Sequence, residues 1–253
     1  MNKLFYSLLF LFSSSQLLAE CAGMGITLWP QGKTLAPNTI LMIDGYAESQ
    51  HIVNGLNGEH PIYLQSKEHK VLLEVLETLQ GEFWITQAIL KPKEALRVGQ
   101  EYELVIENLP DYHSPLKVWN SFVRAYTAPK WMIVQERETP PPSFRETPKE
   151  SKKILKYYGC GPEHFVVFDY TLEQASECLI RTTVTHLATQ TTTTYYLIPR
   201  KQAIYVGHNM CFGAFELENG ADYQVSFSLV NATGQKSSTT PSLSFQAATI
   251  QTD

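Results

Sequence analysis

The sequence predicts an all-β protein built from two antiparallel β-sandwiches in tandem. Short apolar runs alternate with turn residues along most of the chain, and the composition favours strands. A motif with a Leu and a Gly shortly before a Tyr that begins a strand also occurs twice. Its two copies contain Leu96, Gly99 and Tyr102, then Leu217, Gly220 and Tyr223. In sandwiches this is the pattern of a tyrosine corner, whose phenol hydrogen-bonds to the backbone upstream.

Residues 1–19 predict an export signal, with Lys3 as the positive start and a short apolar run over 4–12. The mature chain should then begin at Glu20 and be periplasmic or secreted. No later stretch reaches the roughly 18 apolar residues of a spanning helix, so we expect no transmembrane segment. A competing interpretation is a lipoprotein acylated at Cys21, but Glu20 stands where such signals carry a small residue.

Charge and length limit the function classes. The chain has 20 Lys and Arg against 25 Asp and Glu, and removal of Lys3 leaves 19 against 25, a net charge of −6. Without a basic block, nucleic acid is not an expected partner. The remaining length suits two domains of about 100 residues each.

The first module is expected over residues 20–128. Its clearest element is a hairpin, with a strand over 71–79, a turn over 80–82 and a second strand over 83–90. Apolar residues recur there at every second position, which is the period of a half-buried strand. Strands over 102–107 and 122–127 should close this module.

A proline-rich, charged connector is expected over residues 129–158. Three consecutive prolines, Pro140 to Pro142, favour an extended segment. The charged residues 149–153 are interpreted as a solvated linker face. Residues 131–134 are apolar and could be the first strand of the second module.

The second sandwich is expected over residues 159–253. Its four consecutive threonines, 191–194, predict a strand, because β-branched side chains pack well on a pleated surface. The strands predicted here are 165–170, 178–186, 191–198, 203–206, the segment 210–217, 223–230 and 242–247.

Four cysteines remain after the signal, an even number that indicates disulfides in an exported protein. The preferred pair is Cys160 with Cys211, because each lies beside glycines that let backbones approach. Cys21 and Cys178 are the less certain candidates. Metal thiolate chemistry is disfavoured because no CxxC pair occurs.

At the two Leu-x-x-Gly-x-x-Tyr motifs, the chain resembles immunoglobulin-like and fibronectin type III-like modules of exported bacterial proteins. The first module, with the segments 29–32, 37–38 and 96–104, also resembles short bacterial immunoglobulin-like domains that share the architecture of periplasmic copper carriers. The resemblance implies two tandem immunoglobulin-like sandwiches. It departs from the copper carriers at the mature start, where those place a His and this chain has 20–22, Glu-Cys-Ala.

No catalytic constellation is apparent in the sequence, and neither a cofactor nor a metal is expected. The sequence contains no G-x-S-x-G, Walker A or H-E-x-x-H motif. If a metal site exists, His164, His186 and His208 of the second module are its best candidates. A cysteine–histidine nucleophile is disfavoured against a disulfide. Four aromatics are weighed between exposed contact platforms and core packing, with core packing favoured: Trp84, Trp119, Tyr195 and Tyr196.

The sequence thus favours a non-catalytic binding or structural module of the bacterial envelope or extracellular space. Its partner would be an unidentified envelope protein or glycan, recognised through loops or strand edges. The alternative is a periplasmic metal carrier or a small envelope enzyme built on the second module.

Overall fold

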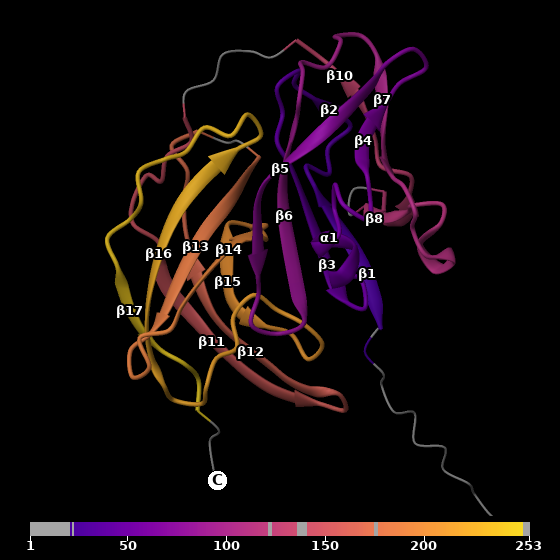
Figure 1. Cartoon of the computed structure of the whole chain (residues 1–253). Coiled ribbons are helices and arrows are strands. Elements are labelled where there is room, and N and C mark those ends of the chain that lie inside the picture. The colour runs from indigo at the N-terminus through magenta and orange to yellow at the C-terminus, as the bar shows by residue number, and fades with distance from the viewer. Residues whose placement is uncertain (1–20, 22, 121–122, 136–140, 175–176, 250–253) are drawn as a thin grey trace, which may run out of the picture.

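The computed structural model describes residues 21, 23–120, 123–135, 141–174 and 177–249 (Figure 1). The expected signal, residues 1–19, lies outside the described residues. Two β-sandwich modules pack side by side, the first in indigo to magenta and the second in salmon-red to yellow (Figure 1). Among the described residues no helix is long and apolar enough to span a membrane.

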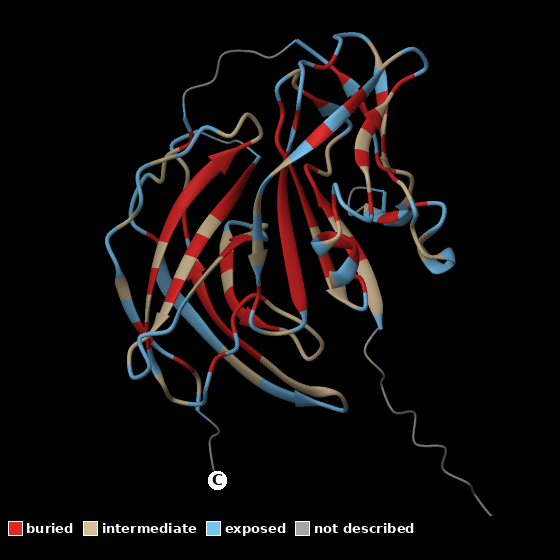
Figure 2. Cartoon of the chain, viewed as in Figure 1, coloured by how far each residue is buried: buried red, intermediate tan, exposed pale blue. Residues whose placement is uncertain are grey.

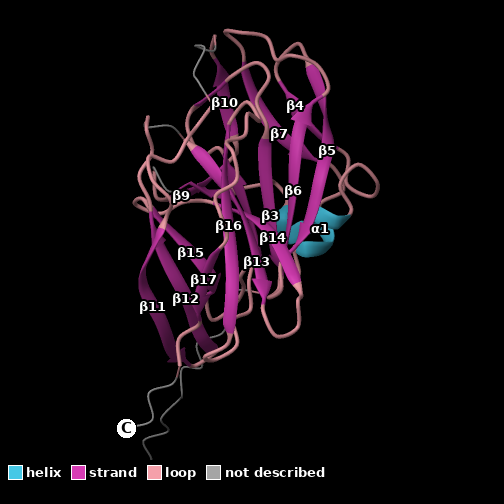
Figure 3. Cartoon of the chain, turned by 90° about the vertical axis from the view of Figure 1, so that its left-hand side faces the viewer, coloured by secondary structure: helices cyan, strands magenta, loops and turns pink. Residues whose placement is uncertain are grey.

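The described residues of the first module form ten strands and two short helical turns. They are β1 (Met24–Trp29), β2 (Thr34–Leu35), β3 (Leu41–Ala47), α1 (Gln50–Asn54), β4 (Ile62–Gln65), β5 (Lys70–Gln80), β6 (Ile85–Pro92), β7 (Glu101–Ile106), the 3-10 turn η1 (Asp111–His113), β8 (Val118–Asn120), β9 (Ala125–Thr127) and β10 (Lys130–Ile133). The helix α1 lies at one side of the molecule, beside the strands (Figure 3).

Eight of these strands form one sheet that folds over into two layers, in the order β1-β3-β6-β5-β4-β7-β10-β2, and β8 and β9 pair as a separate two-stranded sheet. The long strand β5 joins the layers, because its beginning pairs with β4 and its remainder with β6. The predicted hairpin of 71–90 is confirmed by the β5–β6 pairing. Between the layers lies a core that contains Leu41, Ile43, Leu64, Tyr102 and Trp131.

In the second module, the residues that the structure describes form seven strands. They are β11 (Lys149–Tyr158), β12 (Gly161–Asp169), β13 (Cys178–His186), β14 (Thr192–Leu197), β15 (Ala203–His208), β16 (Asp222–Asn231) and β17 (Leu243–Gln246). One sheet has the order β11-β12-β15 and the other β14-β13-β16-β17. A core that contains Phe168, Phe215 and Phe227 lies between the two sheets. Most of β16 is buried, as its red colour in Figure 2 shows. The predicted threonine strand is β14, whereas the segment 210–217 is not a strand: it is a loop with isolated bridges at Gly213.

Two predictions about the connector are wrong. Residues 131–134 do not begin the second module: β10 pairs antiparallel with β7 and parallel with β2, and its Trp131 and Ile133 are buried in the first core. Residues 149–158 form β11, which pairs with β12 along its length. An edge strand can be this polar because its backbone is paired while its side chains stay exposed, and exposed lysines protect such an edge from further pairing.

The two modules are joined by an apolar interface. Trp29, Met42 and Ile89 of the first module pack against Leu179 and Tyr196 of the second. Because these side chains are buried against one another, the hydrophobic effect holds the two sandwiches together.

Polar contacts at the same interface are specific. The Gln87 side chain donates to the Tyr196 carbonyl and accepts from the Tyr196 N–H, both at 3.0 Å, as a neighbouring strand would. Asp44 accepts hydrogen bonds from Gln87 and from the Tyr195 hydroxyl, each at 2.8 Å. Glu77 forms an ion pair with Arg181 at 3.4 Å and accepts a hydrogen bond from the Tyr196 hydroxyl at 3.0 Å.

The disulfide is also an inter-module link. Cys211 is bonded to Cys21, so the predicted pairing of Cys160 with Cys211 is wrong. Cys21 lies three residues before Met24, the start of the edge strand β1, and the ring of Tyr46 in the neighbouring strand β3 stacks on Phe212 at 4.2 Å. This contact brings the start of the first module against the loop that carries Cys211. Cys160 and the buried Cys178 are free thiols.

Candidate functional site

A cavity of about 750 Å³ lies at one end of the second sandwich, and we call it the end cavity. Side chains from both sheets line it, and the β5–β6 loop of the first module closes one side. Ligand pockets typically have volumes of about 300 to 1,000 Å³. Its lining residues are Glu82, Phe83, Tyr157, Pro162, His164, Val184, His186, Thr189, Thr191, Thr193, His208, Glu216, Leu217, Glu218, Asn219 and Tyr223.

Two buried imidazoles line the cavity on one sheet. His164 of β12 and His208 of β15 are directly opposite in the ladder, with ring centroids 6.3 Å apart and exposures of 2% and 4%. His208 Nδ1 lies 2.8 Å from the Asn209 carbonyl, to which it must donate, so a neutral His208 keeps its lone pair on Nε2. His164 Nε2 is buried and has no hydrogen-bond partner among the described residues.

The surroundings of His164 favour its neutral form. Burial lowers the pKa of its imidazole, the Leu217 carbonyl opposes this, and the neighbouring His208 lowers the pKa further. An uncharged imidazole offers one lone pair and one N–H, so the cavity can accept as well as donate hydrogen bonds at this point.

His186 reaches the cavity from the opposite sheet. Its Nδ1 accepts the backbone N–H groups of Ala188 and Thr189, each at 3.2 Å. Nδ1 therefore carries no proton, and in the neutral ring the proton lies on Nε2. That Nε2 is 3.5 Å from a carboxylate oxygen of Glu218. His186 thus points an N–H toward the Glu218 carboxylate at the mouth of the cavity, and no hydrogen bond joins the two in the described residues.

The second tyrosine corner builds this mouth. The Tyr223 hydroxyl accepts the Glu218 N–H at 2.8 Å, and the Tyr223 ring lies edge-on to His186 at 4.8 Å. Burial raises the pKa of Tyr223; the Glu218 N–H opposes this, and the carboxylates of Glu218, Glu82 and Glu216 raise it further. Three carboxylates therefore converge around one phenol. In the first module Tyr102 makes the corresponding contact, accepting the Arg97 N–H at 3.3 Å.

The first module completes the rim. A carboxylate oxygen of Glu82 accepts the Glu216 N–H at 2.6 Å. Phe83 and Gly213 exchange two backbone hydrogen bonds of 3.1 and 2.7 Å, and the Phe83 ring lies 4.7 Å from that of His208. The cavity in this form therefore exists only when the two modules are packed together.

The structure brings the three candidate metal ligands to one cavity but not into a metal centre. Within the described part of the chain no three His, Cys, Asp or Glu side chains are grouped so as to hold a metal ion. The bonding of His186 explains part of this, because ligation through Nε2 would require a proton on Nδ1, where two N–H groups already point. A cysteine nucleophile is also missing from the cavity, since Cys211 is oxidised and Cys160 does not line it.

Sequence reasoning missed the carboxylates. Glu216 and Glu218 alternate within the loop that leads into the second tyrosine corner, and this Glu-x-Glu spacing was the available signal. Glu82 belongs to the other module, so no local pattern could associate it with His164 or His208.

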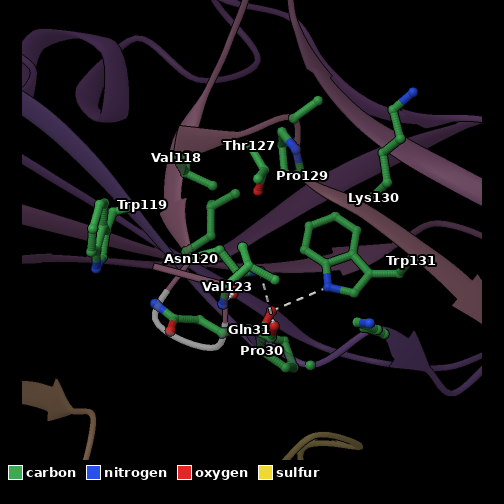
Figure 4. A pocket seen from close by; sticks show the side chains of 14 residues that line it. Pro30, Gln31, Val118, Trp119, Asn120, Val123, Thr127, Pro129, Lys130 and Trp131 are labelled. Atoms are coloured by element: carbon green, nitrogen blue, oxygen red, sulfur yellow. Dashed lines mark hydrogen bonds between the residues drawn. The ribbon is translucent and has the colours of Figure 1, made fainter. Parts of the chain in front are cut away.

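A second cavity, of about 140 Å³, lies in the first module beside β8 and β9 (Figure 4). Trp131 lines it and donates its indole N–H to the Pro30 carbonyl at 3.2 Å. Its volume is too small for most ligands. Of the four aromatics weighed from the sequence, Trp84 and Trp119 are exposed, whereas Tyr195 and Tyr196 are buried.

No family model and no curated protein matches the chain. Among solved structures it is similar to a cytokine receptor complex, with 8% identity and a TM-score of 0.26 over 89% of this chain and 98% of that one. It is also similar to the tandem Ig repeats of Dlar, with 13% identity and a TM-score of 0.28 over 85% and 94%. A pullulanase of Bacillus subtilis str. 168 complexed with maltose matches at 11% identity and 0.24, over 90% of this chain and 25% of the enzyme. The strand pairing described above shows two tandem immunoglobulin-like β-sandwiches, and these low scores assign no function.

Proposed function

We propose that the protein is a non-catalytic, exported binding module of the bacterial envelope or extracellular space, and that the end cavity holds its ligand. The observation that carries the proposal is the composite rim. Glu82 and Phe83 of one module close a cavity whose other walls belong to the second module. Two sandwiches fastened by an apolar interface and a disulfide supply the rigid support that a preformed site needs.

Recognition would use loops rather than a strand edge. The loops at residues 82–83, 189–191 and 216–219 surround the cavity. The long edge strand β11 is the less favourable surface, because Lys149, Lys152, Lys153 and Lys156 are exposed along it and oppose strand addition.

The experiment is a ¹H–¹⁵N NMR screen of the mature chain from Glu20, with its disulfide intact, against a charge-balanced library of fragments, short peptides and oligosaccharides. Ligands should shift the amide signals of residues 186–191 and 216–223. Thr193→Trp should abolish these shifts by filling the cavity. Thr192→Trp is the matched control, because Thr192 is the neighbouring β14 residue and does not line the cavity.

Ligands that bind elsewhere and are indifferent to Thr193→Trp would refute the assignment of the site. Stoichiometric, cavity-dependent binding of Zn²⁺ or Cu²⁺ would favour the metal carrier instead. Turnover of a library member, lost in Thr193→Trp, would favour the enzyme.

A further inference from the structure

In the described part of the chain, the carboxylates that line the end cavity are not balanced by lysine or arginine. Glu82, Glu216 and Glu218 all lie at its exposed rim, and among the described residues no Lys or Arg lines it. A carboxylate group on a ligand would therefore meet like charges, whereas a cation would be attracted.

The buried wall adds an observation that is independent of the carboxylates. His164 is 2% exposed, and its Nε2 has no hydrogen-bond partner among the described residues, although buried polar atoms are normally paired. The neighbouring His208 directs its only neutral-state N–H to the Asn209 carbonyl, so its Nε2 remains an acceptor. The His208 lone pair on the wall and the carboxylates at the rim are acceptors, whereas His186 Nε2, also without a hydrogen-bond partner among the described residues, is a donor. A ligand with several hydrogen-bond donors therefore fits the rim and the His208 lone pair.

The fixed proton of His186 excludes a metal ion as the favoured cation. Its Nδ1 is occupied by two backbone N–H groups, so Nε2 offers a proton and no lone pair. Aromatic rings suit an organic cation better: Phe83, Tyr157 and Tyr223 line the same cavity. The faces of such rings attract ammonium and guanidinium groups.

We infer that the end cavity binds an organic cation with several N–H donors, an ammonium or guanidinium group such as the side chain of a lysine or arginine on a partner protein. The inference rests on the proposed function and names the ligand class for the same site. The carboxylates of Glu216 and Glu218 receive the charge at the mouth, and the His208 lone pair accepts a hydrogen bond deeper in the cavity.

The test titrates four probes into the disulfide-intact mature chain at near-neutral pH and low salt, followed by NMR. They are the N-acetyl methylamides of lysine, arginine, norleucine and N,N,N-trimethyl-lysine. Norleucine has the aliphatic chain of lysine without the charge, and the trimethylated probe keeps the charge without the donors. We expect the lysine or arginine probe to bind about tenfold more tightly than either control, with the difference shrinking as salt is added.

The double variant Glu216→Gln/Glu218→Gln should weaken the lysine or arginine probe by about tenfold or more. Glu59→Gln/Glu68→Gln is its matched control. Both residues are exposed and lie in the first module, and the two substitutions remove the same charge as the test variant. This control should bind the probes as the unmodified chain does.

Equal binding of norleucine, or tighter binding of the trimethylated probe, would overturn the inferred ligand class. If all four probes fail while another library member shifts residues 186–191 and 216–223, the ligand class is wrong and the proposed site stands. If nothing in the balanced library binds there, the proposed function fails as well.

Discussion

The Tyr223 hydroxyl accepts the backbone N–H of Glu218 at 2.8 Å. This one hydrogen bond joins the fold to the site, because the residue that it fixes carries a carboxylate at the mouth of the end cavity. The same motif in the first module, at Tyr102, lies away from that cavity. Comparing variants at Tyr223 and Tyr102 therefore separates the effect of a tyrosine corner on stability from its effect on the cavity.

Tyr223→Phe keeps the ring and removes the acceptor. It should cost about 1 kcal/mol of unfolding free energy, as expected for one lost hydrogen bond, and should weaken ligand binding because the loop that carries Glu218 is released. Tyr102→Phe is the control: urea denaturation should again show a loss, with ligand affinity unchanged. Equal effects of both variants on affinity would contradict the positioning role of Tyr223.

Gln87→Ala should destabilise the inter-module interface. Gln87 is fully buried, and its loss leaves the Tyr196 N–H and carbonyl without the partner that the side chain supplies. We expect a cost of about 2 kcal/mol or more in urea denaturation. Gln246→Ala, at an exposed position of β17, should change stability by less than about 0.5 kcal/mol. A Gln87→Ala variant as stable as the parent would show that this contact contributes little.

Asp44 should make stability depend on pH. Burial raises its pKa from 3.8 to about 7, and hydrogen bonds from Gln87 and Tyr195 only partly oppose this. Between these two values the folded state holds a proton that the unfolded chain has lost, so stability should fall as pH rises from about 4 to about 7.

Urea denaturation across that range should show this fall, and Asp44→Asn should remove most of it. The exposed Asp169, changed to Asn, should leave the profile unaltered. A parent whose stability rises steadily over the same window, with no difference in Asp44→Asn, would show that the carboxyl is not protonated in the folded protein.

The cysteines should separate into three chemical states. Peptide mapping without reduction should find Cys21 linked to Cys211. Cys160 should react with a maleimide in the folded protein, whereas Cys178 should react only after unfolding, because it is buried and burial raises its pKa to about 11. Recovery of a Cys160–Cys211 peptide would contradict this arrangement.

The disulfide closes a separation of 190 residues, so its removal should be costly. Cys211→Ser should lower the unfolding free energy by about 2 to 4 kcal/mol, the usual range for such a link. Cys160→Ser, which removes a free thiol, should cost much less in the same denaturation experiment.

Local patterns in the sequence were sufficient for much of the fold. The period-2 alternation over 71–90 predicts the β5–β6 hairpin, and the Leu-x-x-Gly-x-x-Tyr spacing locates Tyr102 and Tyr223 at the starts of β7 and β16. Composition failed at β11, because an edge strand with exposed side chains has the composition of a linker.

The remaining errors concern contacts between distant segments. Cys21 meets Cys211 only because β1 lies beside β3 and Tyr46 of β3 stacks on Phe212. The sequence was sufficient to select the three histidines of the second module as candidate site residues. It could not predict which ring nitrogen of His186 carries the proton, because the N–H groups of Ala188 and Thr189 determine this.

The most direct test of the account is a long-range ¹H–¹⁵N NMR spectrum of the histidine rings near pH 7.5, recorded without and with the N-acetyl methylamide of lysine. Site-specific variants such as His186→Gln and His208→Gln assign the signals. The account predicts a proton on Nε2 of His186 and on Nδ1 of His208, with the His208 Nε2 signal moving as the lysine probe binds. A proton on Nδ1 of His186, or imidazole signals that do not respond to any bound cation, would contradict it.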